Sequence, residues 1–264
     1  MHRRNIRFHV SYDGTRYLGW QRLGGNQKDL SIQGLIEGVL SNLLNENIKI
    51  MGSGRTDAGV HAFAQVANFY THTNDSIHEL TKKLGDSMPE DIVIYNIEEV
   101  PEDFHSRFSA VGKVYEYYID NVERENVFTR KYAYHVEKKL DIEKMREAAS
   151  YLVGTHDFYS FSTDRGKDDT VRTLYAIDIE ETPFSLGSAD ESRDEKQALL
   201  RIRLHGDGFL YNMVRIIVGT LLEVGAGERK IDSIQIAIDN KKRDLAGITV
   251  PPQGLFLKSV EYKF

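Results

Sequence analysis

The sequence predicts an α+β fold in which two β-α-β-β-α-β halves of ferredoxin or RRM type share a merged, mainly antiparallel sheet with a central cleft. Strand-like and helix-like segments of the first half follow the order β-α-β-β-α-β. The second half repeats that order more loosely, and one half alone would leave a sheet face poorly covered. The predicted halves are residues 1–105 and residues 106–264.

In the first half, periodicity and capping residues define each element. The segments with strand character are residues 6–12, 48–51, 63–70 and 92–97. Ser31 is expected to cap a helix with an apolar stripe, because a serine hydroxyl accepts the unpaired N–H groups of a first turn. Ser76 begins a second helix, which Pro89 ends.

In the second half, strands are expected at residues 114–119, 170–179, 198–205 and 255–262. Asp141 caps a helix that continues to Leu152, and residues 209–224 form an apolar helix. Residues 182–196 are polar and lack periodicity, which predicts an exposed, flexible loop.

Composition limits the class of protein. The chain has 264 residues, 41% hydrophobic and 28% charged, as in ordinary soluble globular proteins. It contains no cysteine, which excludes disulfides and thiolate metal sites. Residues 1–5 enter a strand-like segment without an apolar signal region, and no run is long enough to span a membrane, so we expect a cytoplasmic protein. The net charge of −6 argues weakly against coating nucleic acid, but leaves room for a local basic groove.

A glycine-rich segment, residues 52–62, is the strongest candidate for chemistry. Its sequence is Gly-Ser-Gly-Arg-Thr-Asp-Ala-Gly-Val-His-Ala, in which small residues permit tight turns and the close approach of a substrate. Arg55 and Asp57 are two positions apart and share a side of any extended segment. The segment therefore fits a site of covalent chemistry, and fits equally a capping loop with a solvated ion pair.

Two aromatic segments could bind unpaired bases. Residues 12–22 interleave aromatic rings with arginines, which suits stacking on bases, although Trp20 is also expected to pack on the core. Residues 104–110 precede a strand on which Tyr115 and Tyr117 share a face and Tyr118 opposes them. One face could line a cleft while the other is buried.

An arginine inside an apolar helix completes the candidate set. Arg215 needs a partner, because an unpaired buried charge is costly, and that partner is either a neighbouring helix or a carboxylate in the cleft. Asp57 and His61 could ligate a metal, but no third ligand is evident nearby, so no metal site is predicted. Phosphate-binding, zinc-protease and serine-hydrolase motifs are absent from the sequence.

Taken together, these motifs resemble the tRNA pseudouridine synthase A family (TruA). The matching residues are 12–14 with 19–21, 54–61, 104–110, 157–161, 213–215 and 254–257. The resemblance implies conversion of uridine to pseudouridine in the anticodon stem-loop of tRNA, without metal or organic cofactor, by a homodimer of two-lobed, ferredoxin-like subunits.

The resemblance also implies roles for individual residues. Asp57 corresponds to the nucleophile, Arg55 to a residue that helps to extrude the base, and Tyr115 to a ring that stacks on it. Arg215 corresponds to the arginine that pairs with the aspartate. The substrate-contacting residues expected besides Tyr115 are Phe104, His105, Ser106, Arg107, Phe108, Arg165, Lys167 and Arg172.

Those roles suit the side chains. A carboxylate must be ionised to attack, and a nearby guanidinium favours the ionised form. The target base must leave its stack, at a cost of a few kcal/mol, before a recessed aspartate can reach it.

Some segments depart from the family pattern and keep alternatives open. Residues 84–89 replace the usual Leu-Asn-x-x-Leu-Pro, and residues 23–30 and 163–169 also differ in character. A paralogue that acts on another RNA, a tRNA-binding module without essential catalysis, and a metal-dependent hydrolase using Asp57 and His61 therefore remain alternatives.

Overall fold

The computed structural model describes residues 2–25, 30–164, 166, 169–183 and 198–263. It divides into two compact units, unit 1 with residues 1–113 and 256–264, and unit 2 with residues 114–255. The chain leaves unit 1 inside strand β5 (Ala110–Asp120) and re-enters it at the start of strand β10 (Leu255–Tyr262). Both units combine helices with mainly antiparallel strands, so the predicted α+β fold class is confirmed.

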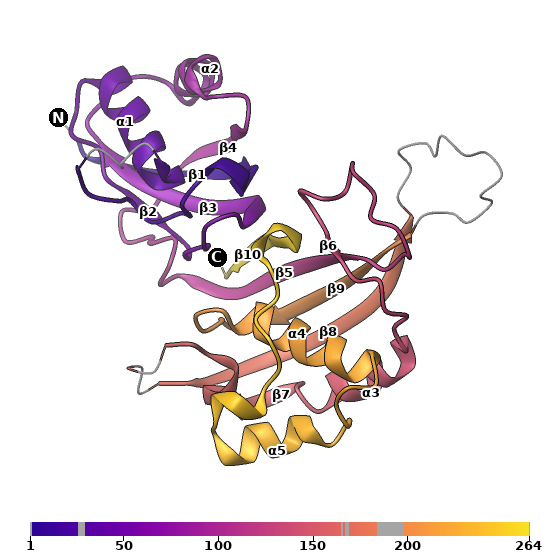
Figure 1. Ribbon diagram of the computed structural model, residues 1–264. Helices are drawn as coiled ribbons and strands as arrows, with labels where there is room; N and C mark the ends of the chain where they lie inside the picture. The colour runs from indigo at the N-terminus through magenta and orange to yellow at the C-terminus, as the bar shows by residue number, and fades with distance from the viewer. Residues whose placement is uncertain (1, 26–29, 165, 167–168, 184–197, 264) are drawn as a thin grey trace. The chain divides into compact units, whose positions relative to one another are not determined.

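Unit 1 has the β-α-β-β-α-β order predicted for it. Its elements are β1 (Arg4–Tyr12), α1 (Ile32–Leu44), β2 (Ile50–Gly52), β3 (His61–Thr71), α2 (Ile77–Ser87) and β4 (Ile92–Val100). β1 lies between β4 and β3, and β2 pairs with β3, all antiparallel. β10 adds a short parallel pairing to the start of β3. Helices α1 and α2 lie on one face of this sheet (Figure 1).

The helices begin where the capping residues predict. The Ser31 hydroxyl accepts the Gly34 N–H at 3.2 Å, and the Asp141 carboxylate accepts the Lys144 N–H at 3.1 Å. Ser76 and Glu79 form a reciprocal capping box. These contacts satisfy N–H groups that have no partner inside the helix.

The core of unit 1 follows the alternation of β1. Ile6, Phe8 and Val10 are fully buried, and the Phe8 ring meets Phe69 edge-on, with 6.0 Å between centroids. The other face of β1 carries polar residues that are nonetheless buried, Asn5 at 2% and Arg7 at 8% exposure. Buried polar groups require partners. The partners of Asn5 and Arg7 include Phe104, which belongs to the candidate site.

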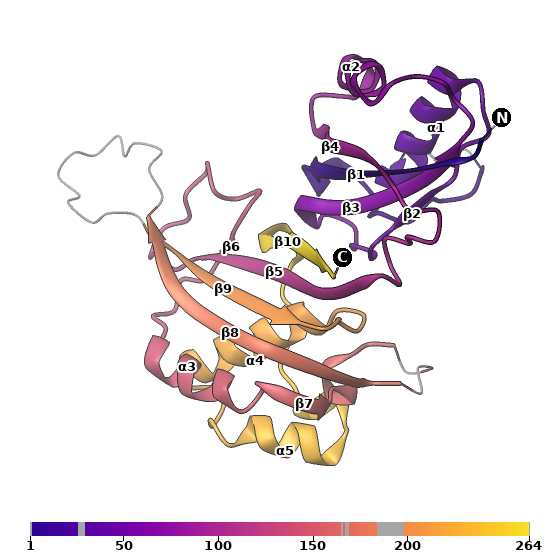
Figure 2. The same ribbon diagram turned by 180° about the vertical axis from the view of Figure 1, so that it is seen from behind.

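The α-helices described in unit 2 lie on one face of its sheet (Figure 2). Its strands are β5, β6 (Tyr134–His135), β7 (Gly154–Asp157), β8 (Val171–Pro183) and β9 (Ala198–Gly206), with β5, β9, β8 and β7 adjacent in that order. Its helices are α3 (Ile142–Ser150), α4 (Met213–Gly225) and α5 (Ser233–Asn240). The sequence analysis did not predict α5, β6 or β7.

Three details correct the sequence-based boundaries. Helix α4 begins at Met213 rather than at residue 209, because Asn212 has a left-handed backbone, with φ of 60°. Helix α3 ends at Ser150, short of Leu152. Thr182 and Pro183 belong to β8, and the rest of the predicted loop lies outside the described residues.

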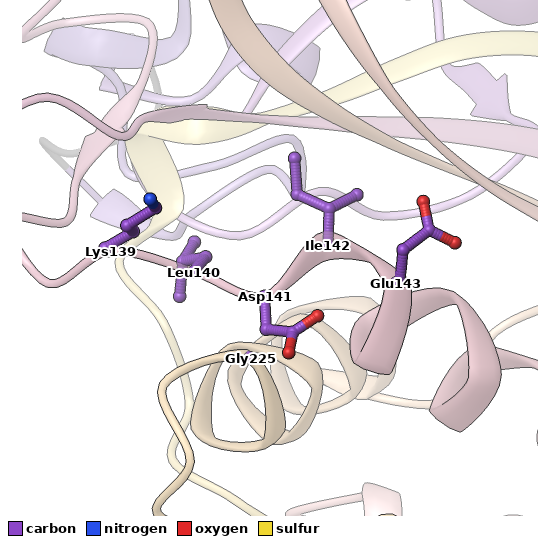
Figure 3. Close-up of a pocket in the computed structure, with 6 residues that line it drawn as sticks. All are labelled: Lys139, Leu140, Asp141, Ile142, Glu143 and Gly225. Atoms are coloured by element: carbon purple, nitrogen blue, oxygen red, sulfur yellow. The ribbon is translucent and has the colours of Figure 1, made fainter.

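A surface pocket of unit 2 lies at the start of α3 (Figure 3). Its lining residues are Lys139, Leu140, Asp141, Ile142, Glu143 and Gly225, none of which belongs to the predicted site. Asp141 already caps α3 and pairs with Lys144 at 3.0 Å, so its carboxylate serves the helix. Among the described helices, none has the length and apolarity needed to cross a membrane.

Candidate active site

Asp57 lies in unit 1, on the loop between β2 and β3 that we call the Asp57 loop (residues 53–60). Its side chain is half-buried, whereas Arg55 is exposed. Backbone hydrogen bonds fix the loop around the aspartate: Trp20 N–H donates to Thr56 O at 3.0 Å, and Val60 N–H to Asp57 O at 3.1 Å. The carboxylate therefore projects from a backbone that is held on both sides.

Two glycines of the turn after β1 allow this loop to pack closely. A Cβ on Gly14 would lie 2.0 Å from Val60 O, inside van der Waals contact. Gly19 has φ of +96°, and its Cβ would lie 2.7 Å from Thr56 O. Both positions require glycine, because any other side chain would push the Asp57 loop away.

The aromatic residues of segment 12–22 support the loop from within. Tyr12, Tyr17 and Trp20 are only 4%, 7% and 2% exposed. The Tyr12 hydroxyl bonds Thr56 Oγ1 at 2.7 Å. The expected burial of Trp20 is thus confirmed, and all three rings pack in the core of unit 1 beneath the Asp57 loop.

Polar side chains also hold the start of the Asp57 loop. Gln65, fully buried on β3, accepts a hydrogen bond from the Ser53 hydroxyl and donates Nε2–H to Gly54 O at 3.1 Å. The Lys113 ammonium donates to Ser53 O at 2.8 Å. The sequence analysis did not single out Gln65. The feature that could have indicated its role is an amide side chain at an inward-facing position of an otherwise apolar strand.

His61 closes the loop at its other end. Its ring is 1% exposed, accepts the Gly14 N–H at Nδ1 (3.0 Å) and stacks on Phe256 with 4.6 Å between centroids. The histidine thus has a structural role that connects the loop with the turn after β1 and with β10. No group of three His, Cys, Asp or Glu side chains suited to a metal ion occurs in the part of the chain that the structure describes.

A second segment of unit 1, the 104–109 turn, separates its residues into two sets. Phe104 and Ser106 are buried, at 7% and 0% exposure. Phe108 is 77% exposed, Arg107 is also exposed, and the ring of His105 lies 4.4 Å from that of Phe108. The outer set therefore presents a cation beside a large aromatic face.

Buried amides anchor this turn on the sheet. Asn68 Oδ1 accepts the Ser106 N–H at 3.0 Å and the Ser106 hydroxyl at 2.8 Å. Asn68 Nδ2 donates to Asn5 Oδ1 at 2.8 Å, and Asn5 Nδ2 donates to Phe104 O at 2.9 Å. The polar residues on the outer face of β1 and β3 are thus explained.

Unit 2 holds the two remaining predicted catalytic residues. Tyr115 on β5 is 8% exposed, and its ring meets Phe209 edge-on at 5.1 Å. Arg215, in the first turn of α4, donates from Nε to Val250 O at 2.7 Å and from Nη1 to Asn212 Oδ1 at 3.0 Å. These bonds orient the guanidinium plane. Because Asp57 belongs to unit 1, its approach to these two residues stays a prediction.

The predicted basic residues of segment 163–172 are only partly described. Arg172, near the start of β8, pairs with Asp169 at 3.3 Å and donates to Val171 O. Arg165 and Lys167 lie outside the described residues.

Comparisons with known proteins agree on one family. Residues 9–109 and 148–263 match the family model described as tRNA pseudouridine synthase. The chain is 42% identical over 259 residues to "tRNA pseudouridine synthase A 2" of Bacillus cereus, covering 98% of this chain and 99% of that protein. It is 45% identical to the proteins of the same name from Clostridium perfringens and Clostridium tetani, covering 98% of this chain and 99–100% of theirs.

Proposed function

Because the chain belongs to the tRNA pseudouridine synthase A family, we propose that Asp57 is the nucleophile with which it converts uridine to pseudouridine in tRNA. The observation that carries the assignment is the Asp57 loop itself, in which backbone hydrogen bonds and the close approach of Gly14 and Gly19 fix one half-buried carboxylate. A fixed nucleophile loses little freedom when it attacks.

The reaction is an isomerisation, so its atoms balance without a co-reactant. The ionised carboxylate bonds covalently to the sugar or the base while the glycosidic C–N bond breaks. The uracil then turns, a C–C bond to the sugar forms, and the proton on that carbon moves to solvent while the freed nitrogen takes one up. The carboxylate is regenerated when its bond to the substrate breaks.

Three further residues act on the everted nucleotide. Arg55, exposed on the same loop, fills the space that the base leaves, and Tyr115 stacks on the uracil ring. Arg215 pairs with the Asp57 carboxylate and keeps it ionised. The orientation of its guanidinium by Val250 O and Asn212 supports this role.

Contact with RNA involves the outer set of the 104–109 turn. Arg107 supplies charge for phosphate, and the Phe108 ring, 77% exposed, supplies a face for a base. Arg172, Arg165 and Lys167 would extend this contact along the anticodon stem-loop. We further propose that the protein is a cytoplasmic homodimer, as its resemblance to the family implies. Sedimentation of the chain with and without tRNA tests its oligomeric state.

The decisive experiment incubates unmodified tRNA transcripts with the protein and with Asp57→Asn, and maps pseudouridine at each uridine. We expect pseudouridine with the wild type, none above background with Asp57→Asn, and nearly equal tRNA affinity for both, because the amide preserves shape and removes the charge. Asp86→Asn, which neutralises an exposed carboxylate of α2, is the matched control and should retain full turnover.

Retained turnover in Asp57→Asn would contradict the nucleophile assignment. Loss of activity on treatment with a chelator would favour the hydrolase alternative. A tRNA-binding module predicts normal binding and no pseudouridine from any variant, and a paralogue predicts pseudouridine in another RNA.

A further inference from the structure

Three stacked rings, which we call the ring ladder, extend from the end of the Asp57 loop along β3 and β10. His61 follows the loop directly and stacks on Phe256, with 4.6 Å between ring centroids and 19° between the ring planes. Phe256 also stacks on Phe63, with 4.8 Å and 16°. Since β10 pairs in parallel with the start of β3, rings from the two strands alternate along the ladder. The Asp57 loop is thus connected to Phe63 by packed rings.

Phe63 lies on the face of the unit 1 sheet that points away from the core. Its neighbour Ala62 is buried and stands opposite Tyr12, a residue of the core. Because successive side chains of a strand point to opposite faces, the Phe63 ring points to the other side. Phe63 is 39% exposed, whereas the other two rings of the ladder are buried. The ladder therefore ends in an aromatic ring that solvent can reach.

A cation lies over this exposed ring. Lys258 is an exposed residue of β10, and its Nζ atom lies 4.6 Å from the centroid of the Phe63 ring. A cation–π contact at an exposed site is weaker than the stacking of a nucleic-acid base on an aromatic ring. A base can therefore take the place of the ammonium over the ring, and the long lysine side chain can turn to the phosphate of the same nucleotide.

The backbone that carries Phe63 is held by two neighbouring strands. The Tyr95 hydroxyl on β4 donates to Phe63 O at 2.9 Å, and the Ser11 hydroxyl on β1 donates to Ala62 O at 3.1 Å. With its ring also stacked on Phe256, Phe63 is fixed before any ligand binds. A fixed ring loses little freedom on binding, which favours affinity.

We propose that Phe63 and Lys258 form a subsite for an unpaired nucleotide of the RNA substrate. The base stacks on the Phe63 ring, and the Lys258 ammonium pairs with the phosphate. A ring with a cation beside it suits the planar base and negative charge of a nucleotide. This inference rests on the proposed function. Because the buried Phe256 ring separates Phe63 from His61, the nucleotide is one that flanks the target and not the one that Asp57 attacks.

The first test compares Phe63→Leu with Phe63→Tyr. Leucine keeps apolar contact with Phe256 and removes the flat face, whereas tyrosine keeps the face. In filter binding with tRNA transcripts, we expect the dissociation constant to rise about 5- to 20-fold for Phe63→Leu and to stay within about twofold for Phe63→Tyr. The single-turnover rate with enzyme in saturating excess should stay within about twofold for both, because the subsite binds RNA without touching the reacting atoms. Thermal melting verifies that both variants are folded.

Lys258→Met tests the phosphate contact through its dependence on salt. Loss of one phosphate contact should weaken tRNA binding about 2- to 5-fold at low salt and reduce the slope of log affinity against log salt by about 0.7–1. Lys82→Met is the matched control, because Lys82 is an exposed lysine of α2, on the helix-covered side of the same sheet (Figure 1). It should leave both the affinity and the slope unchanged.

Phe63→Trp reports directly on stacking at this position. The chain contains one tryptophan, Trp20, which is buried. A base stacked on the new indole should quench its fluorescence, and the quenching should saturate with tRNA over the concentration range in which filter binding saturates. His78→Trp, at an exposed position of α2, is the control and should show no saturable quenching.

Wild-type tRNA affinity in folded Phe63→Leu, an equal loss of affinity in Phe63→Tyr, or unchanged fluorescence of Phe63→Trp at saturating tRNA would each overturn the inference while leaving Asp57 as the nucleophile. A slower single turnover in Phe63→Leu at saturating enzyme, with wild-type affinity, would also overturn it and assign the ring to support of the Asp57 loop. Full activity of Asp57→Asn would instead remove the proposed nucleophile, and the quenching in Phe63→Trp would not change, so the two failures are distinguishable.

Discussion

The Asp57 loop and the 104–109 turn are held in place by different kinds of contact. Each must present side chains to a ligand from a fixed backbone. The loop is fixed largely through backbone packing, since Gly14 and Gly19 let it approach the turn after β1. The 104–109 turn is fixed by side chains, through the amides of Asn68 and Asn5. The loop should therefore be sensitive to added volume, and the turn to lost hydrogen bonds.

Gly14→Ala is expected to have the largest effect. Its Cβ would lie 2.0 Å from Val60 O, so the Asp57 loop must move, and a shift of about 1 Å should lower kcat roughly a hundredfold. Pseudouridine formation in tRNA transcripts measures this rate. Gly24→Ala, where no atom lies within 4 Å of the added Cβ, is the control. Equal rates for the two variants would refute packing as the support of the loop.

Arg215→Lys tests a second case of support by side-chain hydrogen bonds, those that hold the Arg215 guanidinium in unit 2. A lysine cannot reproduce the planar fork that bonds Val250 O and Asn212, so we expect kcat to fall about 10- to 100-fold. Steady-state kinetics with tRNA measures the loss. Arg203→Lys, at a surface pair with Asp178, should leave the rate unchanged, whereas an unchanged rate in Arg215→Lys would exclude the pairing with Asp57.

Asn68→Ala tests the side-chain mode of support. It leaves the buried N–H and hydroxyl of Ser106 and the Oδ1 atom of Asn5 without their partner, which should cost about 2–4 kcal/mol of unfolding free energy. Urea denaturation measures this cost, and KM for tRNA should rise. Asn240→Ala, on the surface at the end of α5, should cost less than about 0.5 kcal/mol.

Phe108→Ala should have the smallest effect, confined to binding. The side chain is 77% exposed, so stability should stay within about 0.5 kcal/mol of wild type, while loss of stacking should weaken tRNA binding about tenfold. Filter binding and thermal melting give the two values. Phe104→Ala, at a site 7% exposed, should show the reverse pattern, and similar behaviour of both variants would contradict the two-sided turn.

Local features of the sequence predicted much of this structure. Ser31, Ser76 and Asp141 cap helices through contacts three residues away, so the signal lies within one window of sequence. The element order of unit 1 followed from periodicity, and the burial of Trp20 followed from its place in a turn at the end of the first strand. For the candidate site, the resemblance supplied the assignment of Asp57, and the residues alone left a capping loop equally open.

Other features were inaccessible because they depend on distant residues or on a single backbone angle. Tyr262 bonds Ser106 across 156 positions, and nothing near either residue indicates the other. The start of α4 depends on the left-handed backbone of Asn212, which an apolar pattern does not reveal. Glu116 lies on a strand among tyrosines, and its burial at 1% depends on Tyr118 and Arg201.

The return of the chain to unit 1 at β10 has a consequence for biosynthesis. The ribosome makes residues 114–255 before it reaches Phe256 and Tyr262, which pack on His61 and Phe104. A nascent chain that ends at residue 113 therefore lacks part of the first folding unit, although domains generally fold as they are synthesised. During translation, the start of β3 in unit 1 therefore stays without its β10 neighbour until all of unit 2 has been synthesised.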